Sequence, residues 1–205
     1  MQTNFWLIRH ALVAEADRAM LYGIKDVALC EETLVAQAVQ YRALAERLPH
    51  PAVWACTPLS RTRRTANAIF AAGYPAQDLR VEAGMIEQNL GEYQGLRHAE
   101  LPALLGAPAH PFWPLAADER PPAGESVTEM LARVGDTMER LAAAHAGRDV
   151  VVLTHGGAIR AAVAHALAVD GYRALQFSVQ NVSLTRLERL RDGWRVVSVN
   201  EMLGF

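Results

Sequence analysis

Short apolar runs alternate along this chain with longer segments of helical periodicity. Residues 5–8, 52–56 and 149–153 are almost continuously apolar, as is typical of parallel strands that are buried on both faces. Over 33–48 and 127–145, apolar residues recur every three or four positions, which predicts amphipathic helices. This order of elements predicts an α/β fold, a three-layer α/β/α sandwich with a mostly parallel central sheet.

Local sequence signals predict where two of the helices begin. Thr57 followed by Pro58 predicts a helix with Thr57 as its N-cap. Ser126 and Glu129 have the spacing of a capping box at the start of the second periodic segment. We therefore expect helices to follow both positions directly.

The remaining segments predict two small strand units and two loops. Residues 79–82 predict a short strand, and 182–199 predict a β-hairpin that turns at Asp192-Gly193. Glycines are too frequent over 84–95 for a regular element, so we expect a loop that contributes to a site. Residues 102–122 hold six of the ten prolines, which predicts an irregular loop that could act as a lid.

Composition narrows the class of protein. The 205 residues fit a single domain, 1–205, and 20 basic against 22 acidic side chains give a net charge of −2, too little positive field for a nucleic-acid partner. There is no secretory signal pattern and no apolar run near the roughly 18 residues of a spanning helix, so we expect a cytoplasmic protein without membrane contact. Every basic residue except Lys25 is an arginine, whose planar fork suits oxyanions.

The predicted strands end in residues that can carry chemistry. Arg9 and His10 follow the first strand, Thr57 and Arg61 the second, and His155 the third. Parallel strands present their carboxyl ends at one edge of a sheet, so these residues would converge there. Such a cluster needs an anion to offset its repulsion, and phosphate suits guanidinium groups and helix N-termini. The cations would also lower the pKa of an imidazole and keep it neutral and nucleophilic.

Five sequence blocks occur in order on these predicted elements. They are Arg9-His10-Ala11, Thr57-Pro58-Leu59-Ser60-Arg61 with Thr65-Ala66, Glu87 ahead of Gly91-Glu92-Tyr93-Gln94-Gly95, Gly124-Glu125-Ser126, and His155-Gly156-Gly157. In this order they resemble the motifs of the histidine phosphatases, the phosphoglycerate mutase-like superfamily. The resemblance spans nearly the whole chain and implies the phosphoglycerate mutase-like fold.

The resemblance also implies a role for each site residue. His10 would be the nucleophile that becomes a transient phosphohistidine, while Arg9, Arg61 and His155 hold the phosphoryl oxygens. Glu87 would donate a proton to the leaving oxygen and then activate water. Gly156, at the start of a helix, would leave its backbone N–H open to the substrate. The resemblance implies neither a metal nor any other cofactor.

The chain departs from the family pattern in the loop after the predicted nucleophile. Ala11, Leu12 and Val13 stand in the place of a Gly-Glu-Ser or Gly-Glu-Thr motif, Ala16 replaces an asparagine, and Met20 aligns where an arginine is common. These changes remove polar groups from the expected phosphate pocket. They bear on the substrate class and on phosphate affinity more than on the reaction itself.

The sequence favours hydrolysis over mutase chemistry. Mutases that resemble this scaffold carry a long insertion that shields the intermediate from water, whereas here only 28 residues separate Gly95 from Gly124. We expect a metal-independent phosphomonoesterase for a small phosphorylated metabolite, similar to the small bacterial phosphatases near α-ribazole 5′-phosphate phosphatase. A phosphoglycerate mutase and a non-catalytic phosphate-binding module stay open as alternatives. A homodimer is compatible with an α/β sheet but is not required by the sequence.

Overall fold

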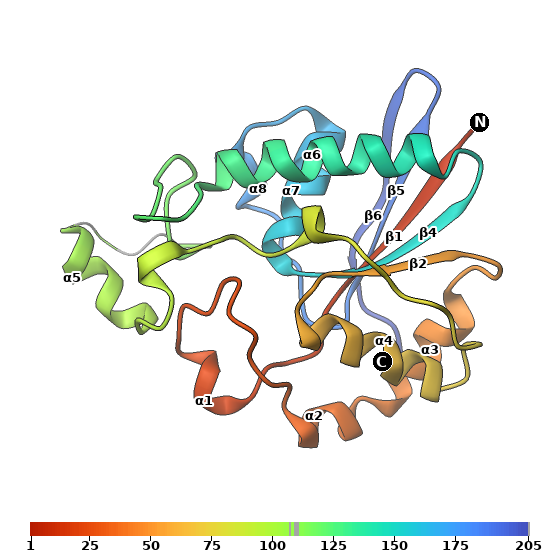
Figure 1. Cartoon of the computed structure of the whole chain (residues 1–205), viewed down its shortest axis with the longest axis horizontal. Coiled ribbons are helices and arrows are strands. Elements are labelled where there is room, and N and C mark those ends of the chain that lie inside the picture. The colour runs from red at the N-terminus through yellow and green to blue at the C-terminus, as the bar shows by residue number, and fades with distance from the viewer. Residues whose placement is uncertain (107, 109–110, 205) are drawn as a thin grey trace.

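The six strands form one sheet in the order β3-β2-β4-β1-β5-β6. The computed structural model describes residues 1–106, 108 and 111–204 (Figure 1). β1, β2, β3 and β4 run parallel to one another, whereas β5 is antiparallel to β1 and β6 to β5. The expected mostly parallel sheet is therefore confirmed, and the predicted C-terminal hairpin forms its antiparallel edge. The strands are β1 (Thr3–Arg9), β2 (Val53–Cys56), β3 (Arg80–Val81), β4 (Asp149–Thr154), β5 (Leu184–Leu190) and β6 (Gly193–Glu201).

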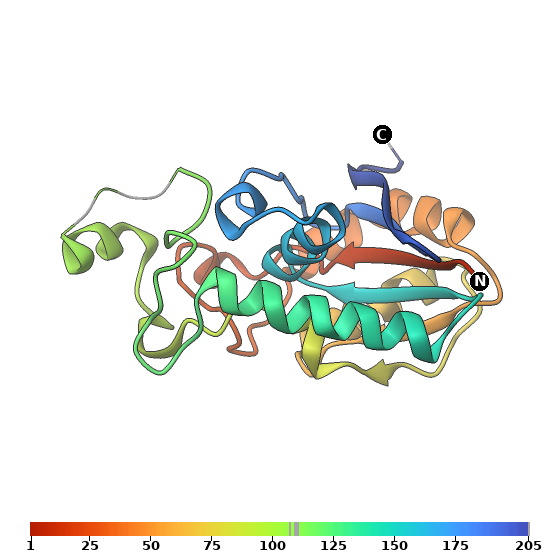
Figure 2. The ribbon, with the colours of Figure 1, turned by 90° about the horizontal axis from the view of Figure 1, so that it is seen from above.

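Helices cover both faces of the sheet because neighbouring residues along each strand point to opposite faces. Phe5, Leu7 and Val152 pack into one apolar core with the side chains of α6 and α7. Trp6 and Ile8 pack into a second core with α3 and α4. The three-layer α/β/α sandwich is thus confirmed, and Figure 2 shows α6 running along one face of the sheet. The helices are α1 (Glu15–Arg18), α2 (Glu31–Ala36), α3 (Ala38–Arg47), α4 (Ser60–Ala71), α5 (Leu101–Leu105), α6 (Val127–Ala144), α7 (Gly156–Leu167) and α8 (Gly171–Ala174).

The local signals were right at one helix start and wrong at the other. The capping box is formed: the Ser126 hydroxyl accepts from the Glu129 N–H, and the Glu129 carboxylate accepts from the Ser126 N–H. Thr57 is not an N-cap, because α4 begins at Ser60 after Leu59. The Thr57 hydroxyl instead contacts His155 across the sheet, a tertiary partner that a local capping rule does not include.

Two other segments contain more helices than predicted. The periodic segment 33–48 forms two helices, α2 and α3, that meet at Gln37. The proline-rich segment 102–122 is mostly irregular, but its first residues belong to α5, with Pro102 in the first turn where a missing N–H costs nothing. Residues 107, 109 and 110 of the expected lid lie outside the described part of the chain.

The carboxyl ends of the four parallel strands open toward one end of the molecule. α1, α5 and the long connections around them lie at this end, away from both chain termini (Figure 1). Along the described ranges, no helix combines the length and apolarity needed to cross a bilayer. The sheet therefore presents its strand-end residues to a region built from loops, where ligand sites of α/β folds are found.

Candidate active site

Strand pairing brings the predicted site residues together. Arg9 of β1 pairs with Thr154 of β4, so His10 and His155 occupy equivalent positions directly after adjacent strands. The His10 N–H donates to the Thr154 carbonyl at 2.9 Å, and the centroids of the two imidazole rings are 5.2 Å apart. The Thr57 hydroxyl, which follows β2, lies 2.9 Å from His155 Nε2. The three strand ends therefore meet in one cluster, as expected.

The surroundings of His10 suit a nucleophile. Its side chain is buried, and Nδ1 lies 2.7 Å from the Ala11 carbonyl oxygen. A carbonyl can only accept, so Nδ1 carries the hydrogen and Nε2 keeps its lone pair. Burial, followed by the positive charges of Arg61 and Arg9, holds the pKa of His10 well below its usual value of 6.5. The ring is therefore neutral at pH 7.

The two arginines each keep a buried N–H without a partner. The terminal nitrogens of Arg61 donate to the carbonyls of Lys25 and Gly23 at 2.7 and 2.8 Å, and a terminal nitrogen of Arg9 donates to the Val179 carbonyl at 2.6 Å. These bonds fix both guanidinium groups. Their Nε–H groups have no hydrogen-bond partner among the described residues. A buried donor left unpaired costs about 1–3 kcal/mol, which makes both nitrogens candidates for ligand contacts.

His155 adds a third such atom beside the same two arginines. Its Nε2 contacts the Thr57 hydroxyl, and its Nδ1 is buried without a partner within the described ranges. Burial lowers the pKa of His155 well below 6.5, and the charges of Arg61, His10 and Arg9 lower it further. Arg9 Nε, Arg61 Nε and His155 Nδ1 therefore form a group of unpaired polar atoms around His10 in which positive charge predominates.

Glu87 is held at the start of α7 by backbone donors. The Thr154 hydroxyl donates to the Met85 carbonyl at 2.6 Å, which fixes the loop leading to Glu87 against β4. One Glu87 oxygen accepts from the Gln88 N–H at 2.9 Å and the other from the Gly157 N–H at 3.1 Å. The Gly157 N–H is thus used by Glu87 and does not face a ligand. Each oxygen keeps a further lone pair that can hold a proton.

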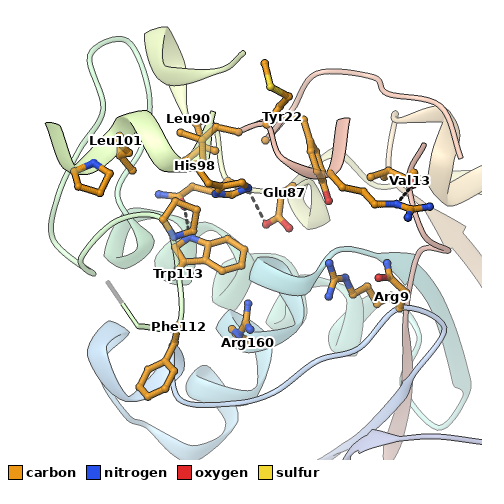
Figure 3. A pocket seen from close by; sticks show the side chains of 18 of the residues that line it. Arg9, Val13, Tyr22, Glu87, Leu90, His98, Leu101, Phe112, Trp113 and Arg160 are labelled. Carbon is orange, nitrogen blue, oxygen red and sulfur yellow. Dashed lines mark hydrogen bonds between the residues drawn. The ribbon is translucent and has the colours of Figure 1, made fainter. Parts of the chain in front are cut away.

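A cavity of about 570 Å³ opens beside this cluster. Arg9, Glu87 and Arg160 line it, and Figure 3 shows their side chains directed toward the same space. Among the residues that the structure describes, the lining does not include His10, Arg61 or His155, which are buried behind it. Tyr22 forms part of this wall, and its ring centroid lies 5.3 Å from the Arg61 guanidinium carbon.

The sequence interpretation missed Arg160, which faces the cavity from the second turn of α7. Its Nε donates to the Phe177 carbonyl at 2.7 Å, and its guanidinium carbon lies 4.8 Å from the Trp113 ring centroid. Burial lowers the pKa of Arg160, and the charge of Glu87 opposes this shift. Arg160 follows the His155-Gly156-Gly157 block by one helical turn, which is the signal that could have identified it.

The departures from the family pattern lie in different places. The Ala11 N–H donates to the Thr65 hydroxyl at 2.9 Å, and the Ala11 side chain belongs to the apolar core under α4. Ala16 is exposed on α1. Leu12, Val13 and Met20, by contrast, line the cavity. The expected loss of polar lining is therefore carried by these three residues.

Comparisons with known proteins show which family the chain resembles. The model of the histidine phosphatase superfamily (branch 1) matches residues 5–202. A metal-independent phosphoserine phosphatase of Arabidopsis thaliana is 30% identical over 213 residues, which cover 99% of this chain and 85% of the relative. A mycobacterial glucosyl-3-phosphoglycerate phosphatase, solved in complex with VO3, is 26% identical with a TM-score of 0.78, covering 97% of this chain and 98% of that one.

A more distant solved structure shares the fold. An α-ribazole-5′-P phosphatase candidate from Escherichia coli str. K-12 substr. MG1655 has a TM-score of 0.81 at 16% identity, covering 99% of this chain and 98% of that one. At this identity the likeness shows the fold alone.

Proposed function

The chain belongs to the histidine phosphatase superfamily and is a phosphatase, and on this premise we propose that it hydrolyses a small phosphorylated metabolite through a phosphohistidine formed on His10, without a metal. The phosphatase relatives in plants and mycobacteria support hydrolysis as the reaction. The 28 residues between Gly95 and Gly124 leave little chain to shield the intermediate from water.

One observation carries this proposal above the others. Arg9 Nε, Arg61 Nε and His155 Nδ1 are buried next to a neutral His10 and have no hydrogen-bond partner in the part of the chain that the structure describes. Phosphoryl oxygens would accept from all three atoms and neutralise the positive charge of the two guanidinium groups. Fixed donors of this kind lower the barrier to phosphoryl transfer because they stabilise charge on the equatorial oxygens without reorganisation.

The reaction would proceed in two displacements at phosphorus. In the first, the His10 Nε2 lone pair forms the P–N bond as the bond to the leaving oxygen breaks, and a protonated Glu87 gives its proton to that oxygen. In the second, Glu87 takes a proton from water while the water oxygen forms the new P–O bond and the P–N bond breaks. Phosphate leaves, His10 is again neutral and Glu87 again carries its proton.

The test is release of inorganic phosphate from a panel of phosphomonoesters in excess chelator. We expect turnover that survives chelation and falls roughly a thousandfold or more in His10→Ala, because the nucleophile is lost. His50→Ala is the matched control, since His50 is exposed before β2 and is not among the described residues that line the cavity.

Three results would overturn the proposal. Release of no phosphate from any ester would favour the phosphate-binding module, and interconversion of phosphoglycerates faster than phosphate release would favour a mutase. Full activity of His10→Ala would exclude the phosphohistidine.

A further inference from the structure

The cavity has a charged end and an apolar end. Arg9, Glu87 and Arg160 lie at the charged end, next to the buried cluster. The loop after β1 contributes Leu12, Val13 and Met20 to the lining. Since all three stand at positions where the family pattern is polar, the apolar wall is a property of this chain and is not shared by the family motif.

The opposite wall is apolar as well. Leu101 and Leu105 of α5 line the cavity together with Trp113, which Figure 3 shows beside His98 and whose ring packs against the Arg160 guanidinium. Leu101 is buried, and Leu105 and Trp113 are partly buried. A ligand that fills the space between the two walls would contact side chains without hydrogen-bonding groups over most of its surface.

Polar lining residues near this end already make hydrogen bonds with the protein or carry no charge. Gln88 donates to the Glu125 carbonyl at 2.9 Å and accepts from the Trp113 indole N–H at 2.7 Å. Arg18 Nε donates to the Val13 carbonyl at 3.0 Å. Burial lowers the pKa of His98, which keeps this ring uncharged at pH 7. Away from these polar groups, a substrate hydroxyl buried against the apolar walls would lose its water without gaining a hydrogen-bond partner.

We propose that the substrate is a phosphomonoester of an alcohol with an apolar body, aliphatic or aromatic, and not of a sugar or a hydroxy acid. This inference rests on the proposed function. The phosphate would lie against Arg9 and the buried donors while the apolar body fills the space between Leu12 and Met20 on one side and Leu105 on the other. Apolar burial would favour the body, whereas an unpaired hydroxyl would be penalised.

A series of n-alkyl phosphates tests the inference because their leaving groups have nearly the same basicity. We expect kcat/KM to rise about threefold to fourfold for each added methylene from ethyl to hexyl phosphate, the value for a buried CH2 group. A terminal hydroxyl on the hexyl chain should reverse most of this gain, because it has no partner in the apolar end.

Variants on adjacent residues of α5 locate the effect. Leu105→Gln should flatten the rise with chain length, whereas Leu104→Gln should leave it unchanged, because Leu104 is 55% exposed and does not line the cavity. Met20→Gln tests the opposite wall and replaces Leu105→Gln if that protein does not fold.

Two failures are distinguishable. If the wild type releases phosphate at the same rate from every chain length, or faster from hydroxylated esters, the apolar substrate is excluded while the phosphatase proposal stands. If neither the alkyl phosphates nor any other phosphomonoester is hydrolysed, the proposed function itself fails.

Discussion

The reactivity of His10 follows from its neighbours. The Ala11 carbonyl selects the tautomer that leaves Nε2 free, and burial together with two guanidinium groups keeps the ring neutral. The same arginines are fixed by backbone carbonyls, so their unpaired Nε–H groups cost no reorganisation when an anion binds. One set of contacts thus prepares both the nucleophile and its oxyanion site.

The pH dependence of kcat/KM should reflect the lowered pKa of His10. The neutral ring is the nucleophile, and its pKa lies well below 6.5. Protonation of His10 should therefore not lower kcat/KM as pH falls from 7.5 to 6.5. Arg9→Gln removes one positive charge, which raises the pKa of His10 and moves the acid limb to higher pH. The measurement is kcat/KM from pH 4.5 to 8 with one substrate for both proteins.

Arg18→Gln is the matched control for this profile. Arg18 lines the cavity but does not contribute to the pKa shift of either buried histidine. Its removal should leave the position of the acid limb unchanged. An identical acid limb in Arg9→Gln and the wild type would contradict the account of His10.

The junction between β4 and α7 shows how an element positions chemistry. Glycine at 157 lets Glu87 approach the helix end, since a Cβ there would lie 2.2 Å from a Glu87 oxygen. At Gly156, a Cβ would lie 3.4 Å from the Arg9 guanidinium, an ordinary contact. The first turn of α7 therefore packs closely against the Arg9 and Glu87 side chains, and the contact with Glu87 leaves no room for a Cβ.

Gly157→Ala and Gly156→Ala form a matched pair. Alanine has a higher helix propensity than glycine, so both variants should fold. Gly157→Ala displaces Glu87 and should lower kcat by roughly tenfold or more, with the 10²–10⁴-fold contribution of general acid–base catalysis as the upper limit. Gly156→Ala should cause a much smaller decrease. Equal kcat values for the two variants, measured with one phosphomonoester, would exclude this role of Gly157.

The sequence predicted elements well where local pattern and tertiary structure agree. The unbroken apolar runs identified β1, β2 and β4, and parallel pairing then explains why Arg9, His10 and His155 meet. The prediction failed where a residue distant in sequence determines the side-chain contact. The Thr57 hydroxyl after β2 contacts His155 after the neighbouring strand β4 and does not cap α4. Arg160 was missed because its position at the cavity depends on contacts with Trp113 and Phe177, which lie in separate loops.

At the scale of the whole molecule, the fold keeps two histidines uncharged that would titrate freely in the unfolded chain. Burial is the first cause of the lowered pKa for both His10 and His155. Their unfolded states bind protons below pH 6.5, whereas their folded states do so only at lower pH. The difference makes the free energy of unfolding depend on pH.

We therefore expect stability to fall as pH decreases below 6.5. Each of the two histidines lowers the free energy of unfolding by at most about 1.4 kcal/mol per pH unit until its folded-state pKa is reached. Thermal unfolding at pH 7.5, 6.5 and 5.5 measures the effect, and His155→Gln should reduce the slope. A free energy of unfolding that stays constant from pH 7.5 to 5.5 in the wild type would contradict this coupling.

In the proposed reaction, phosphate passes through a covalent bond to His10. A rapid quench with a ³²P-labelled phosphomonoester into alkali, where phosphohistidine is stable, followed by mapping of the labelled peptide, detects this bond directly. We expect label on His10, lost on exposure to acid and absent from His10→Ala. Label on another residue, or phosphate release at full rate with no labelled protein at any time, would contradict it.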